Sequence, residues 1–225
     1  MDIEVVRTAA RDLAHCIPGA LASAGGIEVA REGAWGPREA RAIPLDDDTK
    51  GRIVHDEREA PFVANAPDLL VSLSDEKGVA ACAWTRPRPG SALVGLGIDL
   101  ASVEDFAGER GATFNHLLFS KHERRLVTSR YENAGRMEYG YAMAFSAKEA
   151  AFKACAAPLR TWYATHNDLL EFEVREFELA DFSHARGTLR SAEAQRAMGL
   201  MGIQTIALHH VELSGAVMTV AFALA

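Results

Sequence analysis

A glutamate flanked by two lysines is the first group in this sequence that could do chemistry. The stretch AFSAKEAAFKA, which begins at position 144, places Glu149 between Lys148 and Lys153. On a helix, with Phe145 set at zero, Glu149 falls about 40° away, inside a stripe of aromatic side chains. A carboxylate there needs a partner, because burying it unpaired is costly. Two partners are open: Lys153 at i,i+4, or a metal ion with both lysines free for anionic ligand groups.

Asp99 is the second candidate group, and it ends an apolar, glycine-containing run. In the predicted strand 92–99, Gly95 and Gly97 precede it and would allow close backbone approach or serve packing. Ligands gather at the carboxyl ends of strands in α/β proteins. The alternative is that Asp99 caps the following helix, but Ser102 is the better N-cap. One carboxylate from a strand and one from a helix could together hold Mg²⁺, which takes hard oxygen ligands and shares them with substrate phosphates.

Short apolar runs separated by turn residues predict two β-hairpins. The first joins residues 68–74 to residues 79–84, with Gly78 near its turn. The second joins residues 205–213 to residues 216–224 at the end of the chain.

The segment that carries Glu149 is predicted to be a helix over residues 137–157, ended by Pro158 because proline cannot continue a helix. Residues 169–179 alternate apolar and charged side chains, which predicts a strand. Residues 1–30 show no strong period.

A polar break at residues 85–91 divides the chain. Its sequence, TRPRPGS, contains two prolines and is typical of a loop or linker rather than a strand. Strands and at least one helix are expected on each side, so we expect two parts, an N-terminal half over residues 1–90 and a C-terminal half over residues 91–225.

Composition limits the class of protein. The 225 residues are 48% hydrophobic and 24% charged, enough for a globular core, and the formal net charge is -7. That charge argues against a protein that coats nucleic acid or an anionic membrane. Three cysteines without a CxxC pair indicate free thiols in a reducing compartment. The first residues do not form a signal peptide and no apolar run is long enough to span a membrane, so we expect a cytoplasmic protein with neither nucleic acid nor membrane as partner.

The two motifs together resemble the signature pair of the 4'-phosphopantetheinyl transferases. GIDL and FSAKEAAFKA stand in the family's order, about fifty residues apart, with LLFSKHE between them similar to its intervening segment. These enzymes transfer the phosphopantetheine arm of coenzyme A to a serine of an acyl or peptidyl carrier protein. The length is similar to the larger, surfactin-synthetase-activating type. That resemblance implies an α+β fold in which two similar α/β-like halves form an intramolecular pseudo-dimer, and we expect a monomer.

The resemblance also assigns roles. Asp99 and Glu149 look like the ligands of a catalytic Mg²⁺, and Glu149 also like the group that deprotonates the carrier serine, directly or through a water. Lys148 and Lys153 look like the lysines that contact coenzyme A phosphates and the transferring group, so Glu149 and Lys153 are the predicted catalytic pair.

Three positions depart from the family's pattern. The surfactin type usually has a second acid two residues after the aspartate, where this chain has Ala101. Its first-half Ser-His, which meets the nucleotide, is Ser74-Asp75 here, and the lysine before a proline is Ala60. We therefore expect Ser74 and Asp75 at the coenzyme A side of the site, with a changed mode of nucleotide recognition.

Other interpretations stay open at this point. A catalytically degenerate relative would keep the fold and bind coenzyme A or a carrier protein without transfer. A small α/β protein in which both motifs are coincidental is the third possibility. Arg124 and Arg125 are surface groups that could contact an acidic carrier protein.

Overall fold

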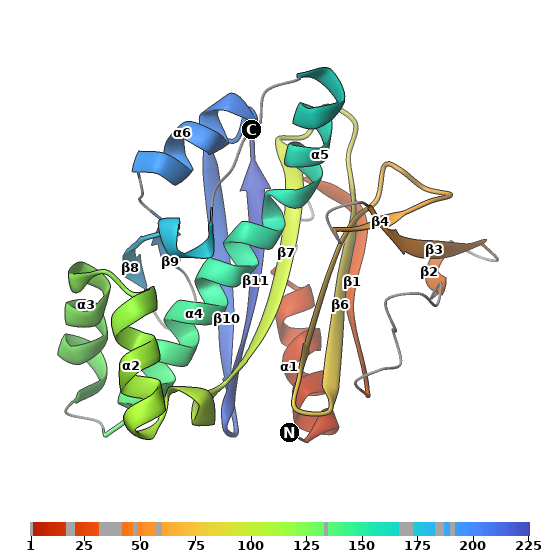
Figure 1. Cartoon of the computed structure of the whole chain (residues 1–225). Helices are drawn as coiled ribbons and strands as arrows, with labels where there is room; N and C mark the ends of the chain where they lie inside the picture. Colours follow the sequence, from red (N-terminus) through yellow and green to blue (C-terminus); the bar gives the residue numbers. More distant parts are fainter. Residues whose placement is uncertain are drawn as a thin grey trace.

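The computed structural model describes residues 2–16, 21–31, 42–46, 49–56, 60–132, 135–166, 173–182, 187–189 and 192–225. The chain has a mixed helix and sheet fold (Figure 1). In chain order its elements are α1 (Ile3–Ala14), β1 (Ala22–Arg31), β2 (Ala42–Asp46), β3 (Thr49–His55), β4 (Pro61–Val63), β5 (Leu70–Glu76), β6 (Val79–Pro87), β7 (Leu93–Ser102), η1 (Val103–Phe106), α2 (Gly108–Leu118), α3 (Lys121–Tyr131), α4 (Met137–Ala154), α5 (Ala156–Thr165), η3 (Val174–Glu176), β8 (Leu179–Phe182), β9 (Gly187–Leu189), α6 (Ala192–Leu200), β10 (Thr205–Leu213) and β11 (Ala216–Leu224). No helix among the described residues is long and apolar enough to cross a membrane.

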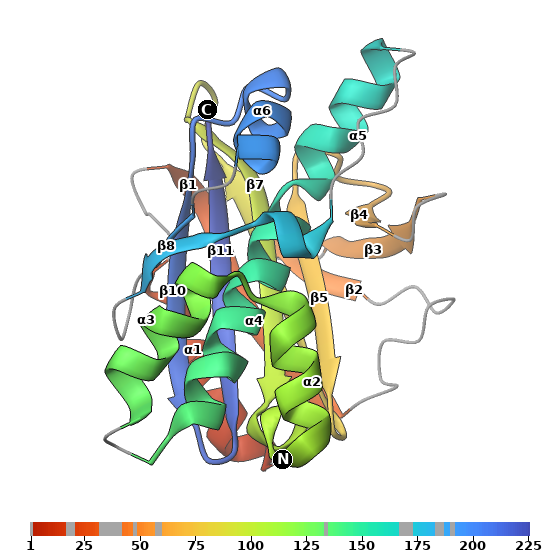
Figure 2. The ribbon, with the colours of Figure 1, turned by 60° about the vertical axis from the view of Figure 1, so that its left-hand side comes forward.

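The described strands form three antiparallel sheets. Their orders are β1-β6-β5, β7-β11-β10-β9-β8 and β2-β3-β4. Helix α4 lies along one face of the strands β7, β11 and β10, while α1 packs behind the sheets, as Figures 1 and 2 show from two directions. The side chains of β7 alternate accordingly: Leu96, Ile98 and Leu100 belong to the core on the α1 side, and the intervening residues face α4.

Both predicted hairpins are confirmed, with adjusted ends. Strands β5 and β6 meet at Lys77 and Gly78, whose φ angles are 46° and 85°. Positive φ at both central residues is the signature of a tight hairpin turn that follows the natural twist of the strands. Strands β10 and β11 turn at Gly215, with φ 78°.

The predicted break at residues 85–91 is wrong in its first part. Strand β6 continues through Pro87, which pairs with Ala22 of β1. A proline can end a strand because only its own N–H is missing from the ladder. Residues 88–92 then connect β6 to β7, and Gly90 adopts φ 73° there.

Three further predictions change in the structure. Helix α4 ends at Ala154 rather than at residue 157, and Pro158 is the third residue of α5, where the missing N–H has no helical acceptor. Residues 174–176 form the short helix η3 instead of a strand, and only Leu179 of the predicted strand 169–179 belongs to β8. Positions 169–172 lie outside the described residues. Ser102 precedes η1, but its side chain accepts no capping hydrogen bond from the backbone of that helix.

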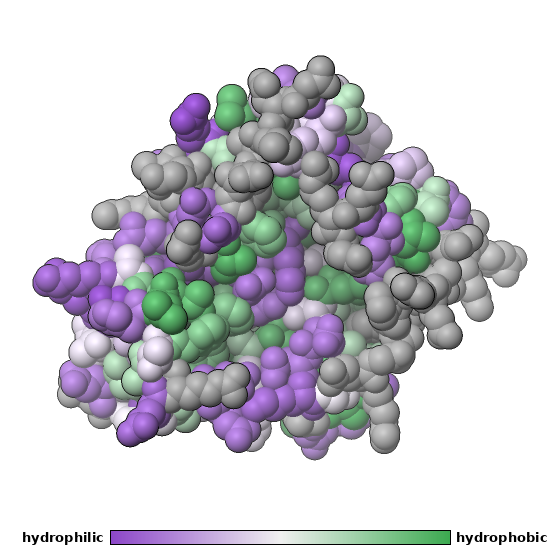
Figure 3. All heavy atoms as spheres, viewed as in Figure 1, coloured by the Kyte–Doolittle hydropathy of each residue, from purple (hydrophilic) through white to green (hydrophobic). Residues whose placement is uncertain are grey.

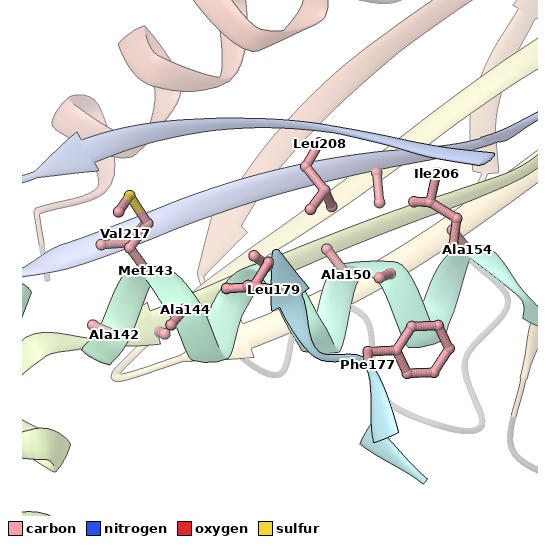
Figure 4. Packing of buried hydrophobic residues seen from close by; sticks show 14 of the residues in the cluster. Ala142, Met143, Ala144, Ala150, Ala154, Phe177, Leu179, Ile206, Leu208 and Val217 are labelled. Atoms are coloured by element: carbon pink, nitrogen blue, oxygen red, sulfur yellow. The ribbon is translucent and has the colours of Figure 1, made fainter. Parts of the chain in front are cut away.

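Two glycines let α4 lie against β7. A Cβ atom on Gly95 would stand 1.9 Å from the carbonyl oxygen of Ala154, and one on Gly97 would stand 1.9 Å from that of Ala150. Any side chain at these positions would collide with helix backbone. The helix faces the sheet with small residues, and Figure 4 shows Ala150 and Ala154 directed toward the strands. This close packing fixes the height of α4 above Asp99.

Serine side chains join β5 to β7, which belong to different sheets. The hydroxyl oxygen of Ser72 accepts a hydrogen bond from the backbone N–H of Ile98 at 3.0 Å. The hydroxyl oxygen of Ser74 does the same for Leu100 at 3.0 Å. These two hydrogen bonds give the N–H groups of Ile98 and Leu100, at the edge of β7, their partners. They hold the sheet β1-β6-β5 directly beside the strand that carries Asp99.

Candidate functional site

Asp99 is the centre of a buried polar cluster built from three elements. It lies on β7 and is 4% exposed. Its Oδ1 accepts a hydrogen bond from Lys153 Nζ of α4 at 2.7 Å and one from Ser74 Oγ of β5 at 3.1 Å. The hydroxyl of Ser146, two turns before Lys153 on α4, donates to the backbone oxygen of Asp99 at 3.1 Å. The carboxylate is thus fixed in position from both the helix and the neighbouring sheet.

The second carboxylate oxygen, Asp99 Oδ2, is buried and has no hydrogen-bond partner among the described residues. Burial raises the pKa of Asp99, against the opposing effects of Lys153 and the hydroxyl of Ser74. A buried carboxylate oxygen without a partner is unfavourable. The position is suited to a ligand that brings positive charge.

Glu149 lies near Asp99 and shares its environment. Burial raises the pKa of Glu149, and the negative charge of Asp99 raises it further, while Lys153 lowers it. Within the described part of the chain, Glu149 forms no ion pair, because Lys153 bonds Asp99 instead. Two carboxylates that repel each other, with one lysine between them, are an arrangement that an added cation would stabilise.

The residues present fit a magnesium ion that keeps part of its coordination for water and substrate. Asp99 Oδ2 and the Glu149 carboxylate are hard oxygen donors. No cluster of three or more histidine, cysteine, aspartate or glutamate residues suited to a metal occurs among the described residues. Ala101, two positions after Asp99, supplies no third carboxylate. A protein cage for the ion is therefore absent from the described residues, and phosphate oxygens and water would have to complete the coordination.

Lys148 is not brought to this cluster. Its side chain is 1% exposed, and its Nζ donates to both carboxylate oxygens of Glu123, at 3.0 and 3.1 Å, and to the backbone oxygen of Leu118 at 3.2 Å. Burial lowers the pKa of Lys148, and Glu123 opposes that shift. The placement gives Lys148 a structural task, joining α4 to α3, and leaves no exposed ammonium group for a phosphate.

Ser74 and Asp75, adjacent in sequence, have different surroundings. Ser74 is 7% exposed and supports Asp99 and the edge of β7, as described above. Asp75 points to the other face of β5 and is exposed. Only the serine therefore touches the cluster.

A cavity of about 370 Å³ opens beside Lys153, and we call it the Lys153 cavity. It lies between α5, the end of α4 and the strands of the N-terminal half. The residues that line it are His55, Asp56, Ala60, Pro61, Val71, Ser72, Leu73, Phe152, Lys153, Ala156, Leu159, Arg160 and Tyr163. It combines apolar walls with cationic groups, which suits an anionic ligand that has an apolar part.

Arg160 is the group in this cavity that the sequence did not reveal. Its Nε donates to Asp56 at 3.0 Å and its Nη2 to the backbone oxygen of Pro61 at 3.1 Å, and its guanidinium lies 4.8 Å from the ring centre of Phe62. The guanidinium therefore lies next to Ala60, the position where the family pattern has a lysine. No local sequence motif marks Arg160, so only the fold reveals that its side chain lines this cavity.

A protein-family model matches more than half of this chain. The profile of the 4'-phosphopantetheinyl transferase superfamily matches residues 95–213. A comparison with curated protein sequences gives no match.

Three of the similar solved structures are acyl-carrier-protein synthases, two of them described as holo-acyl-carrier-protein synthases. The one from Neisseria meningitidis has 16% identity and a TM-score of 0.42, covering 59% of this chain and 99% of that one. The one from Helicobacter pylori, in complex with coenzyme A, has 17% identity and a TM-score of 0.39, covering 57% and 98%. The one from Mycobacterium tuberculosis has 23% identity and a TM-score of 0.37, covering 59% and 98%.

Proposed function

Because the chain belongs to the 4'-phosphopantetheinyl transferase superfamily, we propose that it transfers the 4'-phosphopantetheine arm of coenzyme A to a serine of an acyl or peptidyl carrier protein. The observation that carries this proposal is the buried cluster of Asp99, Glu149 and Lys153, with one carboxylate oxygen unpartnered. Coenzyme A is the proposed co-substrate, and the acceptor is a carrier protein of fatty-acid, polyketide or peptide synthesis.

Asp99 and Glu149 would hold Mg²⁺. When bound, the ion neutralises charge on the pyrophosphate of coenzyme A and on the leaving group. Lys153, whose Nζ is 2.7 Å from Asp99 Oδ1, would add a positive charge at the edge of the Lys153 cavity. Together these charges favour a transition state in which negative charge moves to the leaving oxygen.

Glu149 is the group proposed to take the proton of the carrier serine, directly or through a water. The role rests on the position of Glu149, whose carboxylate lies beside Asp99 and one helical turn from Lys153, within reach of the proposed reaction centre. The serine oxygen forms a bond to the phosphorus that bears the pantetheine, and the bond from that phosphorus to the neighbouring phosphate oxygen breaks. The products are the phosphopantetheinyl serine and 3',5'-ADP, and the serine proton remains on Glu149 until solvent removes it.

The Lys153 cavity is the proposed site for part of coenzyme A. Arg160 and Lys153 would bind phosphate, and the apolar walls near Phe152 and Leu159 would contact the rest of the ligand. Arg160 would also supply the charge that Ala60 lacks, once coenzyme A competes with Asp56 for its guanidinium.

The proposed pseudo-dimer is supported by matching strand orders. In each half a first strand is followed later by a hairpin whose second strand pairs with that first strand: β1-β6-β5 in residues 1–90 and β7-β11-β10 in residues 91–225. Ser74 from the first half contacts Asp99 of the second. One chain can therefore complete the site, and we propose a monomer. The three cysteines form no disulfide with one another, which favours a reducing compartment, and we propose the cytoplasm.

The test is the release of 3',5'-ADP, measured by chromatography, from coenzyme A, Mg²⁺ and an apo carrier protein. We expect release that stops when Mg²⁺ is removed with a chelator and when the carrier serine is changed to alanine. If 3',5'-ADP appears equally without the carrier or with its alanine variant, the proposed acceptor is wrong.

A degenerate relative that only binds is the second candidate, and two positions favour it. Asp75 brings a negative charge next to Ser74, and Ala101 supplies no carboxylate near Asp99. This candidate predicts heat of coenzyme A binding in calorimetry with no 3',5'-ADP from any carrier. Turnover that is lost in Glu149→Gln would exclude it.

A further inference from the structure

The Asp99–Glu149 cluster lies between two hollows. On β5, Ser72 lines the Lys153 cavity, Ser74 bonds Asp99, and Glu76 lines a second cavity of about 590 Å³. These three residues share one face of the strand because they alternate. Along β5, the Lys153 cavity, the Asp99 and Glu149 carboxylates and the second cavity therefore follow one another in that order.

Helix α4 shows the same order. Lys153 lines the Lys153 cavity, Glu149 lies one turn before it, and Phe145, one more turn before, lines the second cavity. Residues four apart lie one above the other on a helix. Ala101, two residues after Asp99 on β7, also lines the second cavity.

The second cavity is an open apolar groove, which we call the Leu117 groove. Its base contains three aromatic rings, Phe106, Phe114 and Phe145, whose centres are 5.6 to 5.8 Å apart. Leu117 at its side is 73% exposed, an unusual position for a large apolar residue. Figure 3 shows hydrophobic residues gathered over α2 and the adjoining part of α4, with hydrophilic residues beside them.

The border of the Leu117 groove is acidic. Glu76 and Asp105 line it. Lys77 lies on the same side, and its Nζ is already 2.7 Å from Glu104 and 3.5 Å from Asp105. The stretch 103–118 holds three acidic residues and one arginine in sequence.

In an in-line displacement, the attacking serine oxygen and the leaving phosphate oxygen lie on opposite sides of the reacting phosphorus. If coenzyme A lies in the Lys153 cavity, the acceptor serine must approach from the side of the Leu117 groove. The groove is therefore placed to contact the residues that flank this serine.

We propose that the Leu117 groove binds the carrier segment beside the acceptor serine, and that its acidic border selects carriers with a lysine or arginine next to an apolar side chain there. This inference rests on the proposed function. An apolar side chain would enter between Leu117 and the aromatic base, while the cation would face Glu76 and Asp105. Opposite charges speed encounter and like charges reject a partner, so a carrier that is acidic at this position is disfavoured.

The experiment measures docking apart from transfer. The dissociation constant of the full chain for an apo carrier is determined by calorimetry without coenzyme A or Mg²⁺, using two forms that differ only in lysine or glutamate beside the serine. We expect the lysine form to bind about two- to fivefold more tightly at low salt, the range for one exposed ion pair. High salt and Asp105→Asn should reduce that preference.

Leu117→Ser is the variant for the apolar contact, with Leu200→Ser on α6, 46% exposed, as its matched control. We expect the first to weaken binding of both carrier forms about tenfold and the second to leave it unchanged. The proposal is overturned by equal or tighter binding of the glutamate form, by no effect of Leu117→Ser, or by no binding of either form. Transfer without this preference would overturn only the docking site, and selective docking without transfer would overturn only the proposed activity.

Discussion

Substitution of Gly97 by alanine should separate the catalytic helix from its partner strand. The new Cβ would stand 1.9 Å from the carbonyl oxygen of Ala150 and 2.7 Å from the backbone nitrogen of Ala154. Both contacts are with helix backbone, so no side-chain rotation can relieve them. Restoring an ordinary contact of 3.4 Å requires α4 to move by about 1.5 Å.

That movement would lengthen the 2.7 Å contact between Lys153 and Asp99 beyond ion-pair distance and would displace Glu149 with it. We expect a loss of about 1–3 kcal/mol in the free energy of unfolding, the usual range for an overpacked core. We expect transfer activity to fall about 100-fold, because an error of about 1 Å in catalytic groups has that effect.

The assay combines urea unfolding with the initial rate of carrier modification. Gly199→Ala on α6 is the matched control, since a Cβ there meets nothing within 4 Å. We expect it to keep full activity and to gain up to about 1 kcal/mol in stability. If Gly97→Ala has the activity and stability of the original protein, the close approach of α4 to β7 does not position the site, and the reasoning is refuted.

Three more predictions concern the surroundings of the site. Lys148→Met should lower the free energy of unfolding by about 3–5 kcal/mol, because it leaves the buried Glu123 carboxylate without its cation. Adding Glu123→Gln should recover much of that loss in urea titrations. An effect of Lys148→Met on coenzyme A affinity alone would contradict the structural role. Ser74→Ala should cost about 1–3 kcal/mol by leaving Leu100 N–H unsatisfied, whereas Ser91→Ala should cost little because its hydroxyl has no partner among the described residues; equal losses would contradict this. Burial raises the pKa of Cys155 to about 12 from 9.0, so the thiol of the unfolded chain loses its proton at lower pH than that of the folded protein. The free energy of unfolding should therefore fall as pH rises above about 9, by about 1.4 kcal/mol at pH 10. The decline should be smaller in Cys155→Ala.

The chemical groups of the site were predictable from sequence because each has a local signature. Asp99 follows alternating glycines at the end of a strand, and Glu149 stands in a short helical motif. The structure explains the glycines: both face α4, at places where an added Cβ would collide with the helix backbone.

The placement of Lys148 was not predictable, because a helical wheel assumes one buried face. Helix α4 is buried on most sides, since α3, η3 and β8 cover what the sheet does not. Lys148 points into that cover and meets Glu123, whose own burial depends on the fold of α3 and β8.

Two elements were missed for other reasons. Helix α1 buries Val6, Ala9, Ala10 and Leu13, which recur at i, i+3, i+4 and i+7. The helical period was therefore present in the sequence, and the prediction of no strong period over residues 1–30 is wrong. The extension of β6 through Pro87 depends on pairing with β1, more than sixty residues earlier, which no local pattern reveals.

The most direct test of the central claim is the intact mass of an apo carrier protein after incubation with this protein, coenzyme A and Mg²⁺, beside a reaction with Glu149→Gln. We predict a gain of one phosphopantetheine unit on the carrier and no gain with the variant. A carrier that gains the unit equally with Glu149→Gln would contradict the assignment of the Asp99–Glu149 cluster as the reaction centre.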